Sequence, residues 1–473
     1  MSLENVILFL DEVKEQKLAT DVLSIFGKHA ISFSQFDDVS RIYFKIKDYD
    51  NAIYYGEKAY AIASTPEQMY TIRHNLINVY NHNNYPEKAL RYIRANEAVM
   101  EHDNDRDFEK AFSLFLLNRK TEAGALLRKK LVDPTLTDEQ KIKVEFNIGT
   151  YDLIDGNFQQ GLKRFLLSGE ELGIWGHDTF ITQKKETYGL TKWNGIVKPG
   201  LKLLVIAEAG IGDEIINVRF MHTLHEYGIH AEWLTLNTRS ELVEIYKLNN
   251  ISACSDITQI STEFLKDCYY VYSMQLPVFL NLKYEDLYTG PYLSNIPVDV
   301  DKKWKNILTS NKVKVGIRWQ GNPSYDQDLH RSIPLIDIMN ALPIDLVFTM
   351  RYEFDLFSIQ RDTGLEELKP FSFIDSNGLI TDLSSKLETL YDLFACINNL
   401  DLVITSCTSV AHIAAAMGKE VCVIVPISCY YVWCNPTDST PWYGDNVHVF
   451  YQKHPRSWSE PLLKLTEYLT NTY

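Results

Sequence analysis

The residues with the clearest chemical potential lie between positions 400 and 418, in the stretch LDLVITSCTSVAHIAAAMG. Its first six residues are mostly apolar and rich in β-branched types, which is typical of a strand buried on both faces. Small polar residues follow, and then an Ala-rich run with helical spacing. Thr408 and Ser409, placed where this helix begins, would offer hydroxyls and backbone N–H groups to an anion. The geometry suits a phosphate group, but an ordinary unliganded strand–helix turn has the same pattern and is the favoured interpretation of this turn taken alone.

The chain that would position such a site has 473 residues. This length is enough for two to four domains. A net charge of −15 argues against a broad basic surface for nucleic acid or anionic membranes, but leaves room for a local basic cleft. All seven cysteines lie between positions 254 and 434 without a C-x-x-C pair, as in proteins of a reducing cytosol. Without a basic leader or a long apolar run, we expect a cytoplasmic protein with no membrane span.

Residues 1–175 are expected to form a helical repeat domain. The small residues Ala52, Ala89, Ala123 and Gly161 are 37, 34 and 38 positions apart. Each follows a predicted helix that carries Tyr or Phe, which is typical of tetratricopeptide-type helix pairs. A generic array of helix hairpins is the alternative. Either array would present a concave face, through which the chain could hold a protein partner or self-associate.

The pattern changes after a Gly-containing connector at 176–199. From residue 200 onward, strand and helix patterns alternate, which predicts parallel sheets. The expected strands are 202–207, 230–236 and 267–273, and then 313–318, 346–350, 400–405 and 421–425. The predicted fold class is therefore α + α/β, a helical array followed by two Rossmann-like lobes that face each other across a cleft. We place the lobes at 200–311 and 312–456, and a final helix within 457–473 could cross back to the first lobe.

Five short patterns occur in a fixed order in this second part of the chain. They are Gly210-Ile211-Gly212-Asp213, SMQLP at 273–277, GIRWQGNPSYDQDLHRSIPL at 316–335, residues 400–426, and Trp433 followed by DSTPWYGD at 438–445. Over roughly residues 200–455 their order and spacing resemble the glycosyltransferase lobes of bacterial tetratricopeptide-repeat proteins. Those lobes are similar to the heptosyltransferase family and, more distantly, to protein O-linked N-acetylglucosamine transferases.

The resemblance implies a glycosyltransferase of GT-B fold, with the nucleotide-sugar donor on the C-terminal lobe and the acceptor on the N-terminal lobe. It implies inverting transfer of a hexosyl, pentosyl or heptosyl group, and neither a cofactor nor a required metal. Inverting transfer needs a base at the acceptor hydroxyl and a site that stabilises the departing nucleoside diphosphate. Asp213 matches the position of the family's proposed base. It is equally well placed to cap the following helix, and the two roles are compatible.

The diphosphate would be held by cations and N–H donors. Arg331 is the first choice because a guanidinium can bind two oxygens at once, and Arg318 and Arg351 at expected strand ends are second choices. Thr408 and Ser409 would form the phosphate cradle. His412 either donates to a phosphate oxygen or is simply packed within its helix.

The expected base or sugar pocket contains Gly212, Trp319, Cys407 and Trp433, although core packing is the ordinary role of a Trp. Three positions depart from the family. Cys407 stands where the family has Asp, Val432 where it has Arg, and Thr440 is an addition, so the donor sugar is not inherited from the resemblance. Cys407 reads as a small buried residue rather than a nucleophile. The pairs Asp299/Asp301 and Asp326/Asp328 imitate a metal-binding D-x-D motif and are interpreted as loop residues.

Two classes of function remain open from the sequence. One is an enzyme that transfers a sugar to a protein, a glycan or a hydroxylated DNA base. The other is a non-catalytic scaffold in which helical repeats bind a partner and the two lobes have degenerated. The changes at Cys407 and Val432 favour the scaffold, whereas Asp213, Arg331 and the Thr408–His412 run favour the enzyme.

Overall fold

The computed structural model describes residues 5, 16–97, 105–174, 187–341, 354–371, 379–434 and 439–473. They form two compact units, one of Met1–Lys130 with His454–Arg456 and one of Leu131–Lys453 with Ser457–Tyr473. This division differs from the expected limit of the helical domain at residue 175, because it assigns the last predicted helix pair to the second unit. Within the described residues, we find no helix with the length and hydropathy needed to span a bilayer.

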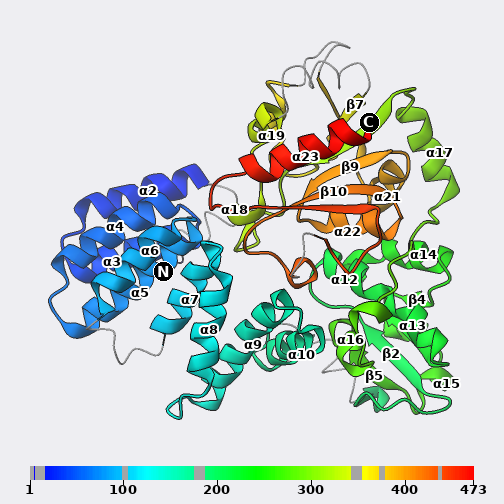
Figure 1. Ribbon diagram of the computed structural model, residues 1–473, viewed down its shortest axis with the longest axis horizontal. Helices are drawn as coiled ribbons and strands as arrows, with labels where there is room; N and C mark the ends of the chain where they lie inside the picture. The colour runs from blue at the N-terminus through cyan, green and yellow to red at the C-terminus, as the bar shows by residue number, and fades with distance from the viewer. Residues whose placement is uncertain are drawn as a thin grey trace. The chain divides into compact units, whose positions relative to one another are not determined.

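The first unit is a series of antiparallel helix pairs, drawn in blue to cyan in Figure 1. Its helices are α2 (Gln16–His29), α3 (Phe33–Lys45), α4 (Tyr49–Ile62), α5 (Pro66–His82), α6 (Pro86–Ala95), α7 (Arg106–Leu116) and α8 (Lys120–Leu131). The small residues Ala52, Ala89, Ala123 and Gly161 lie in α4, α6, α8 and α10 (Phe158–Glu171), and each of these helices follows another helix, so the expectation of helix pairs is confirmed.

The turn inside each helix pair has the same backbone conformation. Lys47, Asn84, Asn118 and Gly156 all have positive φ, between 57° and 83°, and each lies five residues before the small residue of its repeat. The following residue donates its N–H to a carbonyl five positions back, as Asp48 does to Tyr43 at 2.9 Å and Asn157 does to Asp152 at 2.7 Å. This is the Schellman helix ending. Its recurrence with the spacing of the small residues favours true repeats over unrelated hairpins.

The last pair, α9 (Asp138–Ile154) and α10 (Phe158–Glu171), packs through glycines. A Cβ added at Gly161 would lie 2.9 Å from the Leu153 backbone nitrogen, and one at Gly149 would lie 2.6 Å from the Phe165 nitrogen. The rings of Phe146 and Phe165 stack with centroids 5.0 Å apart. A small residue at position 161 is therefore required by the close approach of these two helices.

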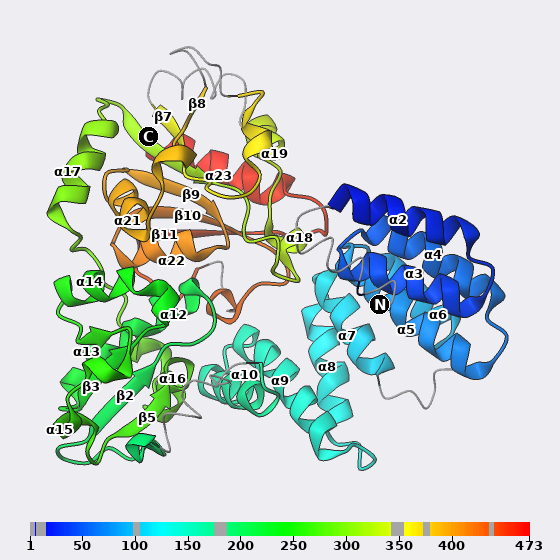
Figure 2. The ribbon, with the colours of Figure 1, turned by 180° about the vertical axis from the view of Figure 1, so that it is seen from behind.

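The first lobe is a five-stranded parallel sheet in the order β1-β5-β2-β3-β4, with helices packed around it (Figure 2). The strands are β1 (Thr191–Lys192), β2 (Lys202–Ile206), β3 (His230–Leu234), β4 (Ala253–Cys254) and β5 (Tyr269–Tyr272). Its helices are α12 (Ile211–Val218), α13 (Phe220–Glu226), α14 (Glu241–Leu248), α15 (Thr262–Leu265) and α16 (Leu276–Phe279). All three strands predicted here are present.

The second lobe is a six-stranded parallel sheet in the order β11-β10-β9-β6-β7-β8. The strands are β6 (Val313–Arg318), β7 (Phe354–Ser358), β8 (Ile380–Asp382), β9 (Leu402–Ser406), β10 (Glu420–Val425) and β11 (Val447–Tyr451). Its main helices are α18 (Asp328–Arg331), α19 (Leu335–Ala341), α21 (Leu390–Asn398) and α22 (Ser409–Ala416). The strand expected at 346–350 lies outside the described residues. This strand order is the doubly wound Rossmann order, so the predicted α + α/β fold class is confirmed.

Two expectations about connecting segments are wrong. Asp299 and Asp301 are not loop residues, because they lie in the first turn of α17 (Val298–Ile307), where carboxylates favour the helix N-terminus. Asp328 likewise begins α18. The final helix α23 (Ser459–Thr472) packs on α19, β10 and β11 of the second lobe rather than crossing to the first. Its apolar residues Leu462, Leu465 and Leu469 complete the hydrophobic core of that lobe.

Candidate active site

Both sheets place the expected site residues at their topological switch points. In the first lobe the strand order reverses between β2 and β5, and Asp213 follows β2. In the second lobe it reverses between β6 and β9. Arg331 ends the short helix α18 that follows β6, and Thr408 lies two residues after β9. Because ligands of doubly wound sheets bind where the strand order reverses, the topology supports a site at these turns.

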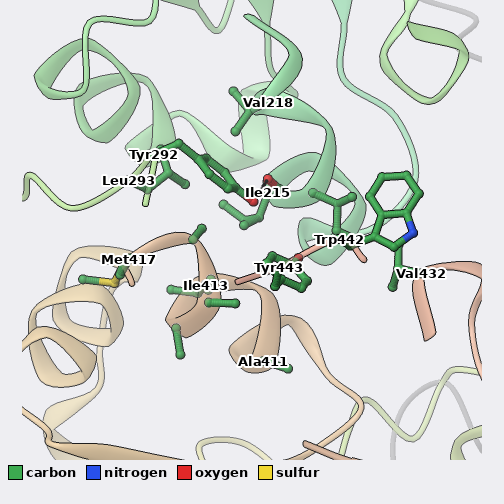
Figure 3. Packing of buried hydrophobic residues seen from close by; sticks show 14 of the residues in the cluster. Ile215, Val218, Tyr292, Leu293, Ala411, Ile413, Met417, Val432, Trp442 and Tyr443 are labelled. Carbon is green, nitrogen blue, oxygen red and sulfur yellow. Dashed lines mark hydrogen bonds between the residues drawn. The ribbon is translucent and has the colours of Figure 1, made fainter. Parts of the chain in front are cut away.

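The helices that begin at these turns, α12 and α22, pack against each other across the two lobes. A Cβ added at Gly212 would lie 3.2 Å from the His412 ring and 3.6 Å from the Ser409 Cα atom. Further along, apolar residues of both lobes fill the contact, as Figure 3 shows for Ile215 and Ile413. We call this contact between α12 and α22 the lobe interface. The lobes meet here in a packed, buried surface, and the first turns of the two helices are held together.

Asp213 lies in the first turn of α12, at the third helical position rather than at the N-cap, which is Gly210. One carboxylate oxygen, Oδ2, accepts from the Gly210 backbone N–H at 2.9 Å. The other, Oδ1, accepts from the hydroxyl of Tyr430 at 2.6 Å. Burial raises the pKa of Asp213 above its ordinary value, while the hydrogen bonds from Tyr430 and Gly210 and the charge of Arg239 oppose the rise.

The backbone before Asp213 is held in an uncommon conformation. Ala209 has a φ of 57°, a region that residues with a side chain seldom occupy. Arg239 stabilises it by donating to the Ala209 carbonyl at 2.6 Å and to the buried Glu214 carboxylate at 3.1 Å. Glu214 also accepts from Trp233 at 3.1 Å, so this carboxylate is fully used in fixing the turn.

Arg331 lies beside the turn that follows β9. Its Nη1 atom is 3.4 Å from the carbonyl oxygen of Cys407, and its Nε atom donates to Asp328 at 2.8 Å. The guanidinium carbon lies 4.5 Å from the centre of the Tyr325 ring. About 20% of the side chain is exposed. The structure thus brings Arg331 and the β9–α22 turn together, as the sequence predicted from separate motifs.

Thr408 is the N-cap residue of α22, but its side chain makes no capping hydrogen bond. Its hydroxyl instead lies 3.3 Å from the Thr405 hydroxyl. Ser409 is partly buried at the first helical position, next to Gly212. A helix that begins without a side-chain cap retains backbone N–H donors for another acceptor.

His412 and Trp433 form a stacked pair within the protein. Their rings are 5.2 Å apart at an angle of 18°, and His412 Nδ1 lies 2.8 Å from the Tyr443 hydroxyl. Burial, aided by the charge of Arg219, lowers the pKa of His412 to about 3, so the ring is neutral. This is the packed arrangement anticipated as one of two possibilities. The phosphate-binding role of His412 stays a prediction.

The other predicted residues are placed as follows. Arg318 is partly buried at the end of β6, with Nη1 3.3 Å from the Ile359 carbonyl. Burial lowers its pKa to about 10, and it remains charged at neutral pH. Trp319 is fully buried in the core of the second lobe. Burial raises the pKa of the Cys407 thiol to about 12, which fits a packed thiol rather than a nucleophile. Arg351 lies outside the described residues.

Arg219 was not anticipated, although it is the most unusual charged group of the lobe interface. It is fully buried, and no carboxylate of the described residues pairs with it. Its guanidinium donates to the carbonyls of Ile216 and Trp442 and to the Tyr292 hydroxyl. Its central carbon lies 4.6 Å from the Tyr443 ring centre. A cation held by carbonyls and ring faces of both lobes fixes the lobe interface. Arg219 lies between α12 and α13, and nothing in the neighbouring sequence signals this role.

Two of the three departures from the family contact each other. The Thr440 hydroxyl donates to the carbonyl of Val432 at 3.0 Å and accepts from the Trp442 backbone at 3.2 Å. The added hydroxyl thus shapes the main chain around the apolar Val432. Within the described residues, no three His, Cys, Asp or Glu side chains are grouped so as to hold a metal ion.

Comparison with known proteins gave no matching family model and no match among curated proteins. Among solved structures, the chain is similar to the ADP-heptose lipopolysaccharide heptosyltransferase II of E. coli, at 12% identity over 57% of this chain and 98% of that one, with a TM-score of 0.38. A glycosyl transferase of family 9 from Veillonella parvula matches at 11% identity over 55% and 88%, with a TM-score of 0.37. An O-GlcNAc transferase mutant from Thermobaculum terrenum matches at 12% identity over 93% and 90%, with a TM-score of 0.30. These are proteins of the kinds that the sequence motifs resemble.

Proposed function

We propose that this protein transfers a glycosyl group from a nucleotide-sugar to a hydroxyl acceptor, with inversion and without a metal ion. The observation that carries the proposal is the meeting of two switch-point turns. The carboxylate of Asp213 on the first lobe is bonded to Tyr430 of the second, close to the turn where Arg331 lies beside Cys407. A base and a cation on facing lobes are what displacement at a sugar carbon requires.

In this proposal each group has one task. Asp213 takes the proton of the acceptor hydroxyl. At the same time the hydroxyl oxygen of the acceptor bonds to the sugar carbon, and the bond between that carbon and the diphosphate oxygen breaks. A raised pKa makes this carboxylate a stronger base than an exposed one. The negative charge that develops on the diphosphate faces Arg331 and the uncapped first turn of α22. Arg318 supplies a second positive charge at the end of β6.

The first test is a thermal-shift screen against a panel of nucleotide-sugars. A ligand at one hundred times its Kd stabilises the folded state by about 2.7 kcal/mol, which is readily seen. We expect at least one donor to raise the Tm and its diphosphate product to do so as well. The donor that binds is then offered with candidate acceptors, namely peptides, glycans and hydroxylated DNA, and sugar transfer is followed by mass spectrometry.

The matched variants are Arg331→Ala and Arg119→Ala. Both remove one positive charge, but Arg119 is an exposed residue of the first unit that pairs with Glu122. We expect Arg331→Ala to weaken donor binding by roughly 10- to 100-fold, as for loss of a charged hydrogen bond, and Arg119→Ala to leave it unchanged. Equal donor affinity of wild type and Arg331→Ala in calorimetry would refute the assignment of the diphosphate site.

A further inference from the structure

A single side-chain hydrogen bond joins the proposed base to the opposite lobe. The Tyr430 hydroxyl donates to Asp213 Oδ1 at 2.6 Å, across 217 positions of sequence. Oδ2 is already taken by the Gly210 backbone N–H. Because each carboxylate oxygen has two lone pairs, Oδ1 keeps one acceptor position after binding Tyr430. That position is where the proton of an acceptor hydroxyl would be received.

Tyr430 is itself held firmly on the second lobe. Its carbonyl accepts from the Trp433 N–H at 2.9 Å, at the start of a short 3₁₀ turn that follows β10. Its ring lies edge-on to Tyr431, with centroids 4.6 Å apart, and to Phe165 of α10, at 6.3 Å. The last helix of the repeat region therefore braces the tyrosine that contacts the base. Through this ring contact, α10 helps to hold Tyr430 in place within the second unit.

We infer that Tyr430 is the positioning residue of Asp213, which it holds in one orientation for as long as the two lobes are packed together. The inference rests on the proposed function. The Tyr430 hydroxyl and the Gly210 N–H, one on each carboxylate oxygen, together fix the carboxylate rotamer. Since Tyr430 belongs to the donor lobe and Asp213 to the acceptor lobe, separation of the lobes would release the base from this orientation. Tyr430 does not itself exchange a proton with substrate.

The charged and titratable groups around Asp213 indicate how its pKa should change when the Tyr430 hydroxyl is removed. Among the described residues, the titratable and charged groups that interact with Asp213 are Arg239 of the first lobe and Tyr325, Tyr430 and Tyr431 of the second. Glu214 is its neighbour in the chain, and His412 lies next to Gly212. Burial raises the pKa of Asp213, and the Tyr430 hydrogen bond is the first of the contributions that lower it. Removal of that hydroxyl should therefore raise the pKa further, so that the basic form is reached only at higher pH.

The test compares Tyr430→Phe with Tyr284→Phe. Phe keeps the ring contacts of Tyr430 and removes only the hydroxyl. The Tyr284 hydroxyl is buried and finds no hydrogen-bond partner among the described residues, so its loss controls for the same substitution. We expect Tyr430→Phe to lower kcat by roughly 10- to 100-fold, as for loss of a hydrogen bond to a charged group, with donor Kd within twofold of wild type. The acid limb of its pH–rate profile should move to higher pH, and Tyr284→Phe should match wild type.

The double variant Tyr430→Phe/Asp213→Asn distinguishes positioning from general damage. If Tyr430 acts through Asp213, the double variant transfers sugar at the rate of Asp213→Asn alone. A further loss in the double variant, or a Tyr430→Phe enzyme with wild-type kcat and pH profile, would overturn the inference while the proposed function stands. A wild-type protein that turns over no nucleotide-sugar would overturn both.

Discussion

Replacement of Arg219 by Met offers a strong test of how the two lobes are held together. Met keeps the length and apolar character of the side-chain stem and removes the charge. Arg219 is fully buried and donates hydrogen bonds to the carbonyls of Ile216, Tyr288 and Trp442. The bond to Ile216 is 2.8 Å long and the bond to Tyr288 is 3.2 Å long. The variant leaves these carbonyls pointing at an apolar group.

The magnitude follows from what remains after the change. A buried carbonyl that loses its donor costs about 1–3 kcal/mol, and removing one side of a buried charged network costs about 3–5 kcal/mol in all. The variant no longer buries an unpaired cation, and this gain offsets part of the lost stability. We expect a net loss of about 3–5 kcal/mol in the free energy of unfolding of the second unit. At roughly 2–4 °C per kcal/mol, that lowers its Tm by roughly 6–20 °C.

The assay can isolate the second unit. All eight tryptophans lie at position 175 or beyond, outside the residues of the first unit, so tryptophan fluorescence reports unfolding of the second unit alone. Arg119→Met, at the exposed ion pair with Glu122, is the control and should leave this transition unchanged. A fluorescence Tm of Arg219→Met within 2 °C of wild type would refute the reasoning that this cation stabilises the lobe interface.

Three further predictions concern activity, packing and pH. Asp213→Asn should retain donor affinity in calorimetry but lower the transfer rate by ~10²–10⁴, as for loss of a general base, and near-normal transfer would reduce Asp213 to a helix-terminal residue. Gly161→Val places side-chain atoms against the backbone of α9 and should destabilise the second unit by about 1–3 kcal/mol or more in urea titrations, whereas unchanged stability would show that α9 and α10 separate easily. Asp392 is buried, which raises its pKa, but hydrogen bonds from Lys303, Trp304 and Thr389 outweigh burial and lower it below 3.8. Its contribution is therefore present above pH 4 and is lost as pH falls through the lowered pKa, so Asp392→Asn should be less stable than wild type at pH 7, by a margin in urea titrations that shrinks as the pH is lowered through that range.

Features set by local sequence were predictable. The helix pairs could be predicted because the small residues from Ala52 to Gly161 recur every 34 to 38 positions. The residue with positive φ lies five positions before each of them. The strands β2 and β6 begin at their predicted residues because apolar, β-branched runs define them. The turns at Asp213 and Thr408 follow predicted strands, so both could be placed at carboxyl ends of strands, whereas the strand order that puts them at switch points was not predicted.

Features set by contacts between residues far apart in the sequence could not be predicted. The partners in the Asp213–Tyr430 and Arg219–Trp442 bonds are 217 and 223 positions apart, and neither pairing leaves a local pattern. Asp299 and Asp301 were misread for a different reason. The DVDK run was compared with a metal motif, although acidic residues ahead of Trp304 and lysines are also the ordinary signal of a helix start.

The departures from the family gain a physical meaning at the lobe interface. The resemblance expects a cation at position 432, where this chain has a fully buried Val. The Val432 carbonyl is bonded to Thr440, the Thr440 oxygen to the Trp442 N–H, and the Trp442 carbonyl to Arg219. A positive charge is therefore present in this region, but it comes from the first lobe and is spent on joining the lobes. Among the residues that the structure describes, Arg331 and Arg318 are the cations that we propose for a donor diphosphate, and the Arg331→Ala variant tests that proposal directly.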